Sequence, residues 1–420
     1  MEKEIPGRVV HGGTLLWHRK HSDRPLLDFS ANLNPFPPEI PWNPDPSTLS
    51  SYPDDRYEAL REAIARTFHR RPGEIAVGNG SMEIIRVFCQ ATLSPGDGFF
   101  LDPPTFGEYE LSARITGALP VEEPGRARVR FLCNPNNPTG ALLPAARVRE
   151  DLRQARNSGG VPSRGAPTQS RGAPIPPGQE EPLRASSPRD SPGSFGPGIL
   201  FLDEAFIELS DPAESLVEEE DPSLFVLRSL TKAFAVPGLR FGYGFGDPDL
   251  IARMEVLRPP WSVNTFAEEF ALLAFRHYDR LGESRQKIAK EREWLEEGLG
   301  DLGLAPLPSS VNFLLVLLGE PASDLAARLL EKGILVRDCA SFGLPNAMRV
   351  AVRNRDENRQ LLEALSACLP CSWREGRGPG SGWARSPSWI SAEGPWSPGS
   401  LMPSPWPASM SWWLHPAGPP

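Results

Sequence analysis

The sequence predicts an α/β protein with a mostly parallel sheet between helices, followed by a smaller α+β domain. Two observations support this class. From about residue 57 to residue 245, short apolar runs alternate with stretches of helical periodicity, as parallel strands alternate with their crossover helices. After residue 312, shorter strand-like and helix-like stretches follow one another within about 55 residues, which indicates a second, smaller unit.

The first half of the large domain alternates helix and strand in chain order. Residues 57–68 place Leu60, Ile64 and Phe68 on one face, which is the period of an amphipathic helix. The elements that follow are each bounded by Gly, Pro or Asn, residues that end regular structure. They are strands at 74–77, 98–101 and 129–133 and helices at 81–92 and 109–116.

The second half continues the pattern and leads into the smaller domain. The large domain closes with strands at 199–202, 224–227 and 241–245, read from short apolar runs. Longer periodic stretches predict helices at 265–278 and 283–299. The smaller domain is expected to contain strands at 312–317, 334–337 and 348–352 and helices at 322–332 and 356–367.

Two stretches are not expected to fold. Residues 157–198 are dominated by Pro, Gly, Ser and Arg, and residues 371–420 repeat Trp, Ser, Pro and Gly without any period. Such compositions bury too little apolar area to offset the entropy of ordering. We therefore expect an N-terminal arm with a small-domain segment (1–45), a large domain (46–250) with a disordered insert (155–198), a small domain (251–368) and a disordered tail (369–420).

Composition limits the classes of function. The chain has 44 basic and 53 acidic residues, a net charge of −9, which argues against nucleic acid or an anionic membrane as a partner. The N-terminal residues do not resemble a signal peptide, and no run approaches the roughly 20 apolar residues of a membrane span. Five scattered Cys, including Cys368 and Cys371, are interpreted as reduced thiols of a cytoplasmic protein rather than a redox or zinc site.

Polar residues follow the predicted strands at their carboxyl ends, where ligands gather in open α/β sheets. The turn at residues 78–81 (Gly-Asn-Gly-Ser) opens a helix, which offers backbone N–H groups and a positive dipole end to a phosphate. Asn137 lies in the heptapeptide Asn-Pro-Asn-Asn-Pro-Thr-Gly at 134–140, and Asp203 follows the apolar run 199–202. Taken singly, these features also fit a turn, a stiff loop and a helix cap.

A lysine completes the set. Lys232 follows the strand at 224–227, and Arg240 lies eight residues further on. A single loop lysine is usually a surface residue, but the whole set fits the needs of an electron-sink cofactor. Such chemistry requires a lysine to form an imine, a carboxylate for a pyridine nitrogen, a donor to the ring hydroxyl, an aromatic face and a phosphate cup. Lys232, Asp203 and Asn137 would supply the first three, and Phe106 the aromatic face.

These motifs resemble the fold-type I pyridoxal-phosphate enzymes, the aspartate aminotransferase superfamily. The resemblance covers about residues 9–367 apart from the insert. It rests on residues 134–140, Leu-Asp-Glu-Ala-Phe at 202–206, and Ser-Leu-Thr-Lys-Ala-Phe at 229–234 with Arg240. It implies a mostly parallel seven-stranded sheet in the large domain, a smaller α+β C-terminal domain, and pyridoxal phosphate as the cofactor. It also implies a homodimer.

The resemblance assigns roles to individual residues. Lys232 would carry the cofactor, Asp203 would pair with the pyridine nitrogen and Asn137 with the ring oxygen. Phe106 would stack on the ring, and Tyr52 would reach across a dimer interface to the neighbour's phosphate. The remaining phosphate contacts would come from Gly80, Ser81, Met82, Ser229, Thr231 and Arg240.

Two branches of the superfamily compete, the threonine-phosphate decarboxylases and the histidinol-phosphate aminotransferases. In both, the substrate is a small phosphorylated amine or amino acid. Arg349 resembles the arginine that binds the substrate carboxylate, a role suited to guanidinium geometry, and Arg337 the arginine that meets the substrate phosphate.

Three features favour the decarboxylases. His11-Gly12-Gly13 resembles their N-terminal motif, which closes over the substrate phosphate. Residues 28–35, with Asn32, match their next segment. Phe106 and Phe206 stand where the aminotransferases usually have Tyr. Thr14 departs from the pattern, because an Asn is expected there. The phosphate end of the substrate would meet His11, Gly12, Asn32 and Arg337.

A non-enzymatic interpretation is a regulator module, but regulators of this fold carry a fused DNA-binding domain. The acidic charge and the lack of a basic helix-turn-helix pattern count against it. A further possibility is that the insert between Asn137 and Asp203 makes the product inactive. If the insert loops out at the surface, the site survives, because the cost of closing a loop grows slowly with its length.

Overall fold

The computed structural model describes residues 8–21, 25–158 and 197–369. The tail expected at 369–420, apart from Leu369, and most of the insert expected at 155–198 lie outside these residues. Where the expected insert overlaps them, the structure differs. Residues 155–157 complete helix α5 (Ala145–Asn157), because Val148, Leu152 and Ala155 form an apolar face that is buried in the core.

A seven-stranded, mostly parallel sheet forms the centre of the large domain, as predicted. The strand order is β2-β8-β7-β6-β5-β3-β4, and β8 runs antiparallel to both of its neighbours. The other pairs are parallel. The bounds are β2 (Ile75–Asn79), β3 (Gly98–Phe100), β4 (Leu119–Pro120), β5 (Val129–Cys133), β6 (Ile199–Asp203), β7 (Leu224–Ser229) and β8 (Phe241–Phe245).

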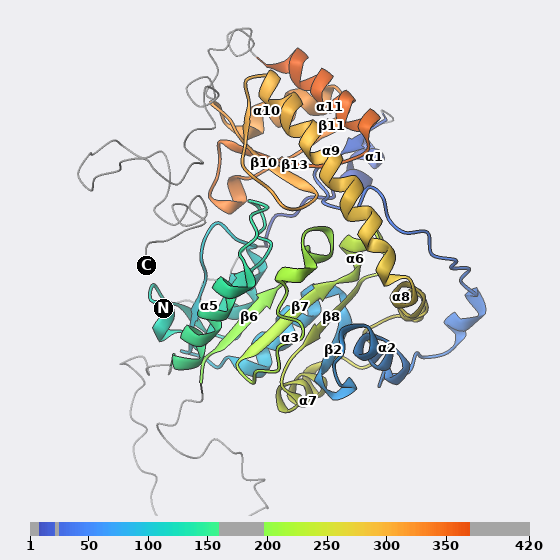
Figure 1. The fold of residues 1–420 in the computed structure, drawn as a ribbon, viewed down its shortest axis with the longest axis vertical. Coiled ribbons are helices and arrows are strands. Elements are labelled where there is room, and N and C mark those ends of the chain that lie inside the picture. The colour runs from blue at the N-terminus through green and yellow to red at the C-terminus, as the bar shows by residue number, and fades with distance from the viewer. Residues whose placement is uncertain (1–7, 22–24, 159–196, 370–420) are drawn as a thin grey trace, which may run out of the picture.

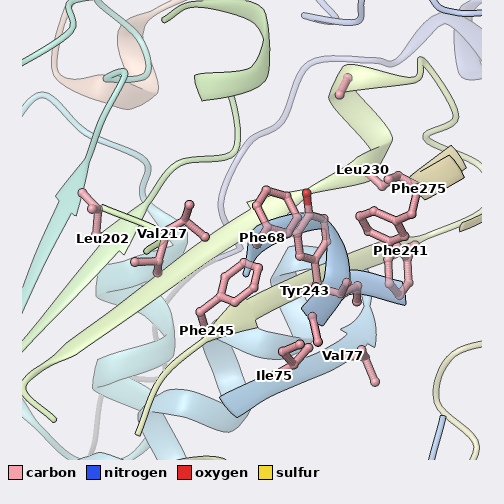
Figure 2. Packing of buried hydrophobic residues seen from close by; sticks show 14 of the residues in the cluster. Phe68, Ile75, Val77, Leu202, Val217, Leu230, Phe241, Tyr243, Phe245 and Phe275 are labelled. Atoms are coloured by element: carbon pink, nitrogen blue, oxygen red, sulfur yellow. The ribbon is translucent and has the colours of Figure 1, made fainter. Parts of the chain in front are cut away.

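Helices cover both faces of this sheet (Figure 1). Side chains alternate between the faces along each strand: Leu202 packs with α2, α5 and α8 on one face, and Phe201 with α3, α4 and α7 on the other. Figure 2 shows the first of these cores, where Phe68 lies against Tyr243 and Phe245. The helices are α2 (Glu58–Phe68), α3 (Gly80–Thr92), α4 (Glu108–Ile115), α6 (Leu230–Ala233), α7 (Pro248–Leu257) and α8 (Thr265–Arg276).

The small domain combines two short sheets with helices. An antiparallel sheet has the order β12-β13-β10-β9, and β1 pairs with β11 in parallel, which brings the N-terminal segment into this domain. The long helix α9 runs between the two domains in Figure 1. The elements are α1 (Leu15–His21), β1 (Leu27–Asp28), α9 (Leu281–Asp301), β9 (Ala305–Pro306), β10 (Phe313–Leu317), α10 (Ala322–Glu331), β11 (Ile334–Leu335), β12 (Arg337–Asp338), β13 (Ala347–Ala351) and α11 (Arg355–Cys368).

The domain boundary expected at residue 250 falls too early. Leu250, Ile251 and Met254 of α7 pack in the large-domain core, and residues of α8 through to Leu281 pack on its other face. Helix α7 was not expected from the sequence, although Asp247 caps it and Pro248 occupies its first turn. The small domain therefore begins within α9, whose Leu295 and Leu299 join the third core. Among the described residues, no helix is long and apolar enough to cross a lipid bilayer.

Candidate active site

Three of the predicted site residues lie at or just beyond the carboxyl ends of neighbouring strands. Asp203 is the last residue of β6, Asn137 follows β5, and Lys232 lies in α6 directly after β7. Because β5, β6 and β7 are adjacent and both of their pairings are parallel, the three side chains share one edge of the sheet. This is the edge at which open α/β sheets bind ligands.

Helix α3 begins at the same edge and forms a narrow cradle with β8. Gly80 has φ +75, a backbone conformation that favours glycine, and it lies so close to Arg240 that a Cβ would be 2.3 Å from the guanidinium and would displace it. A Cβ on Gly242 would lie 2.4 Å from the Ser81 backbone N. The hydroxyls of Ser229 and Thr231 lie 2.8 Å apart. Backbone N–H groups at a helix start, two hydroxyls and a guanidinium form a phosphate-binding set.

Asp203 is held by two donors. The Tyr109 hydroxyl donates to its Oδ2 over 2.6 Å, and the backbone N–H of Ala205 donates to its Oδ1 over 2.8 Å. Burial raises the pKa of Asp203 to about 6, and both donors oppose that rise because they stabilise the charged carboxylate. Tyr109 was not identified from the sequence, yet it is fully buried and stacks on Phe131.

Lys232 is held through the backbone of its short helix. Asn34 fixes this backbone with two hydrogen bonds: its N–H donates to the Lys232 carbonyl over 3.1 Å, and its side-chain amide donates to the Ala233 carbonyl over 2.7 Å. Burial, with the positive charges of Arg349 and Arg240, lowers the pKa of the lysine to about 8, and Asp203 opposes this. A lysine amine that is partly neutral near neutral pH can act as a nucleophile and as a base.

Arg349 and Arg337 lie side by side on neighbouring strands. They are direct partners in the antiparallel register of β13 and β12, a placement that is unfavourable for two like charges. Arg349 is buried and donates to Asn137 Oδ1 and to the Ser30 carbonyl, and its Nε has no partner in the part of the chain that the structure describes. Burial, followed by the charge of Arg337, lowers the pKa of Arg349 to about 10. The pair is suited to an anion that supplies the missing negative charge.

The predicted N-terminal motif lies against both domains. The carbonyl of Val10 accepts from the Arg337 guanidinium over 2.8 Å, and the His11 ring lies 5.9 Å from the Phe106 ring. Gly12 packs so closely on Ser30 that a Cβ would lie 2.4 Å from the Ser30 carbonyl oxygen. The structure therefore brings His11, Gly12 and Phe106 to the side of the arginine pair.

Two further predicted residues have different surroundings. Asn32 is buried, and its Oδ1 has no partner among the described residues; this acceptor remains available for a donor group. Tyr52 is 79% exposed and stacks on Trp261 with ring centroids 4.4 Å apart. The described contacts do not bring Tyr52 to Lys232, and its role at a dimer interface stays a prediction.

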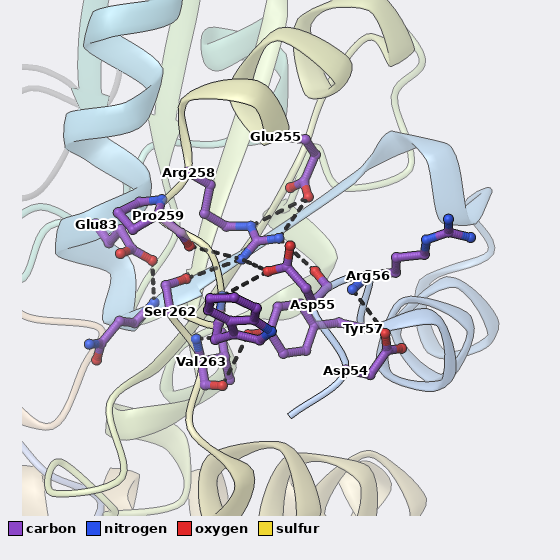
Figure 3. Close-up of polar contacts among 12 residues, drawn as sticks. Asp54, Asp55, Arg56, Tyr57, Glu83, Glu255, Arg258, Pro259, Ser262 and Val263 are labelled. Atoms are coloured by element: carbon purple, nitrogen blue, oxygen red, sulfur yellow. Dashed lines mark hydrogen bonds and ion pairs between the residues drawn. The ribbon is translucent and has the colours of Figure 1, made fainter. Parts of the chain in front are cut away.

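The loop after Tyr52 is fixed by Arg258. Its guanidinium donates to the Asp55 carboxylate over 3.2 Å and to the Asp55 carbonyl over 2.7 Å, and it pairs with Glu255 over 3.2 Å (Figure 3). The Tyr57 hydroxyl donates to the Val263 carbonyl over 3.0 Å. These contacts tie the chain beside Tyr52 to the loop between α7 and α8.

Sequence reasoning missed the first turn of α4. It identified Phe106 but not Glu108 or Tyr109, which contact His11 and Asp203 respectively. Tyr109 lies three residues after Phe106, which precedes α4, and the two rings are 5.5 Å apart, so its nearness to an identified site residue was the available signal. The partners could not be identified, since they lie 97 and 94 positions away along the chain.

The residues at this edge fit pyridoxal phosphate. The start of α3 presents backbone N–H groups beside Arg240, Asp203 presents a carboxylate held by two donors, and Lys232 presents an amine of lowered pKa. The fold and this site define a pyridoxal-phosphate enzyme of fold-type I. The chain belongs to the family described as aminotransferase class I and II, which it matches over residues 26–162 and 197–365.

Relatives within this family carry two kinds of name. A "Putative threonine-phosphate decarboxylase" from Caldanaerobacter subterraneus subsp. tengcongensis is 33% identical over 80% of this chain and 88% of its own length. A histidinol-phosphate aminotransferase from Symbiobacterium thermophilum is 28% identical over 88% of this chain and 96% of its own length. The chain is similar to both.

Solved structures agree on the fold. A histidinol-phosphate aminotransferase from Clostridium acetobutylicum superposes with a TM-score of 0.64 at 27% identity, covering 81% of this chain and 98% of that one. The enzyme of that name from Sinorhizobium meliloti, in complex with pyridoxal 5'-phosphate, has a TM-score of 0.66 at 23% identity, covering 86% and 95%. L-threonine-O-3-phosphate decarboxylase from Porphyromonas gingivalis has a TM-score of 0.61 at 22% identity, covering 76% and 92%.

The contact between Tyr109 and Asp203 leads to a first testable expectation. In the Tyr109→Phe variant the carboxylate loses its hydroxyl donor, so the pKa of Asp203 should rise further above 6 and its charged form should become scarcer at neutral pH. We expect weaker binding of pyridoxal phosphate by roughly tenfold, the value of a hydrogen bond to a charged group. Equilibrium dialysis between pH 6 and 8 measures this, and an unchanged dissociation constant would contradict it.

Proposed function

We propose that this protein catalyses the decarboxylation of L-threonine O-3-phosphate to (R)-1-amino-2-propanol O-2-phosphate and carbon dioxide, a reaction of cobalamin biosynthesis. The observation that carries the proposal is the position of the N-terminal motif: the His11 ring lies beside Phe106, Gly12 packs on Ser30, and the Val10 carbonyl accepts from Arg337. This arrangement supports a binding site for a substrate that bears a phosphate as well as a carboxylate.

The cofactor would supply the electron-withdrawing chemistry, and residues of this chain would bind and orient it. Pyridoxal phosphate, when bound, withdraws electrons from the bonds at the substrate Cα. Asp203, as a carboxylate, would keep the pyridine nitrogen protonated, and Asn137 would donate to the ring oxygen. The phosphate of the cofactor would be held by Gly80, Ser81, Met82, Ser229, Thr231 and Arg240, with Tyr52 of a second copy in a homodimer.

The geometry of the substrate would decide which bond breaks. The bond perpendicular to the cofactor ring is the one that overlaps its π system, so the groups at the two ends of the substrate set the reaction. Arg349 would hold the carboxylate, while Arg337, His11 and Asn32 would hold the phosphate. With the carboxylate bond so oriented, that bond would break with loss of carbon dioxide, and the protonated amine of Lys232 would deliver one proton to Cα.

Histidinol-phosphate aminotransfer is a second candidate. Several curated relatives with that name are 26–30% identical to this chain. In that reaction the Cα–H bond would be perpendicular, and Lys232 would remove the proton. The two Phe side chains favour the decarboxylase, because Phe106 and Phe206 stand where aminotransferases of this branch usually have Tyr.

One experiment separates the two activities. Purified protein with pyridoxal phosphate is incubated with L-threonine O-3-phosphate, and carbon dioxide and aminopropanol phosphate are measured. A parallel reaction contains histidinol phosphate and 2-oxoglutarate, and glutamate is measured. We expect carbon dioxide in the first reaction and at most a trace of glutamate in the second. Glutamate without carbon dioxide would replace the decarboxylase proposal with the aminotransferase.

A further inference from the structure

The segment from Val9 to Gly13 makes contacts with both domains. Val9 packs on Gly107 of the large domain, where a Cβ would lie 3.4 Å from the Val9 side chain. The next residue, Val10, accepts from Arg337 of the small domain over 2.8 Å. His11 returns to the large domain, where its Nε2 lies 2.8 Å from Glu108 Oε1. Gly13 donates from its N–H to Ser30 Oγ over 2.9 Å.

Little apolar area holds this segment in place. Val10 is 57% exposed, and His11 and Gly13 are also exposed. A segment with few buried apolar contacts opens easily, so its position depends on polar contacts such as those of Val10 and His11. Of these two contacts, that of Val10 is made by its backbone carbonyl. That of His11 is made by its side chain, which is expected to meet the substrate.

Glu108 is well placed to fix that side chain. It is 5% exposed and is the first residue of α4. One carboxylate oxygen contacts His11, and the other lies 3.4 Å from the guanidinium of Arg86 on α3. A carboxylate that is itself fixed by a second partner orients an imidazole and selects which ring nitrogen remains free. The adjacent residue, Tyr109, contacts Asp203, so the same turn serves both ends of the site.

We propose that Glu108 is a positioning residue that docks His11 at the phosphate-binding side of the substrate site. The carboxylate accepts from Nε2–H of the protonated His11 ring, which leaves Nδ1–H to donate to the substrate phosphate and holds the ring beside Phe106. Docking of His11 also keeps the Val10 carbonyl against Arg337. This inference rests on the proposed function, because it assigns a phosphorylated substrate to the site.

The first test uses Glu108→Gln, which keeps the shape of the side chain and removes its charge. Loss of one hydrogen bond to a charged group corresponds to roughly a tenfold change in an equilibrium. In the holoenzyme we expect hydrogen exchange of the amides of residues 9–13 to accelerate about tenfold. We expect the KM for L-threonine O-3-phosphate to rise by a similar factor, with kcat changed less than about twofold, because Arg337 and Asn32 would still hold the phosphate end and keep the bound substrate aligned.

Two variants make the test specific. Glu110→Gln is the matched control: Glu110 lies in the same helix and pairs with Arg114 over 2.8 Å on the exposed surface, and its loss should change neither readout. His11→Phe keeps an aromatic ring but removes the donor, and it lies outside the packed core, so it should fold even if Glu108→Gln does not. The double variant should be no more impaired than His11→Phe alone, because Glu108 acts on the substrate only through His11.

The outcomes are distinct. A raised KM, together with faster hydrogen exchange at residues 9–13 and non-additive effects of the two substitutions, would support the docking role of Glu108. Unchanged exchange, unchanged KM or additive effects would overturn it. If only histidinol phosphate is turned over, the decarboxylase proposal fails, but the same KM comparison with histidinol phosphate still tests Glu108. Absence of turnover with both phosphorylated substrates would overturn both proposals.

Discussion

Replacing Lys232 with alanine should abolish turnover and the visible absorbance of the bound cofactor. The amine is expected to bond to the cofactor and to transfer the proton at Cα, and general acid–base catalysis alone contributes about 10²–10⁴-fold. We therefore expect activity to fall by at least about 10⁴-fold. The fold should persist, because the buried contacts of α6 are made by Leu230, Ala233 and the backbone carbonyls that Asn34 contacts.

The pH dependence of cofactor capture gives a second readout of the same lysine. The pKa of Lys232 is lowered to about 8 by burial and by the charges of Arg349 and Arg240. Because the neutral amine is the nucleophile, the rate of capture should increase as pH rises through about 8 and then level off. Lys290→Ala, on the exposed face of α9, is the control. A Lys232→Ala protein that keeps both turnover and absorbance would refute the assignment.

The chain order of strands and helices could be predicted well because the apolar runs are short and separated by Gly, Pro and Asn. Residues 129–133 and 241–245 form strands with the predicted bounds. The run at 334–337 was wrongly expected to be one strand. It divides into β11 and β12, because Leu335 pairs with β1 while Arg337 pairs with β13. Pairing partners this distant leave no local mark in the sequence.

The candidate site shows the same division. Lys232, Asp203 and Asn137 follow strands within recognisable motifs, so they could be found from the sequence. Glu108 and Tyr109 could not be assigned, since neither belongs to those motifs and their partners come from other parts of the chain. The pairing of Arg337 with Arg349 was equally hidden, because it depends on the register of two strands that a turn separates.

That pairing also connects stability with function. Two arginines in direct register, one of them with an Nε that has no partner among the described residues, are unfavourable in the free protein. An anionic substrate would relieve the repulsion, so the same feature that destabilises the empty site would favour binding. Sites arranged in this way often gain stability when the functional residue is replaced by an apolar one.

Replacement of Arg349 should therefore separate catalysis from stability. Arg349 and the substrate carboxylate would form a buried charge pair, and truncating one partner of such a pair costs about 2–5 kcal/mol. Arg349→Ala should therefore lower kcat/KM for an amino-acid substrate by roughly 30- to 5000-fold. Binding of pyridoxal phosphate should change far less, because Arg349 does not contact the cradle at Gly80, and its contact with Asn137 is to Oδ1 and leaves the Nδ2 group for the ring oxygen. Steady-state kinetics and equilibrium dialysis measure the two effects.

The apolar replacement Arg349→Met tests the effect of Arg349 on stability. It fills most of the volume, removes the charge that faces Arg337, and leaves no unpartnered Nε in the interior. We expect a melting temperature equal to or above that of the parent, together with the same loss of kcat/KM as the alanine variant. Arg359→Ala, which removes an exposed arginine paired with Asp356, should change neither quantity. Equal losses of activity, cofactor binding and stability in Arg349→Met would show that the arginine serves the fold rather than the substrate.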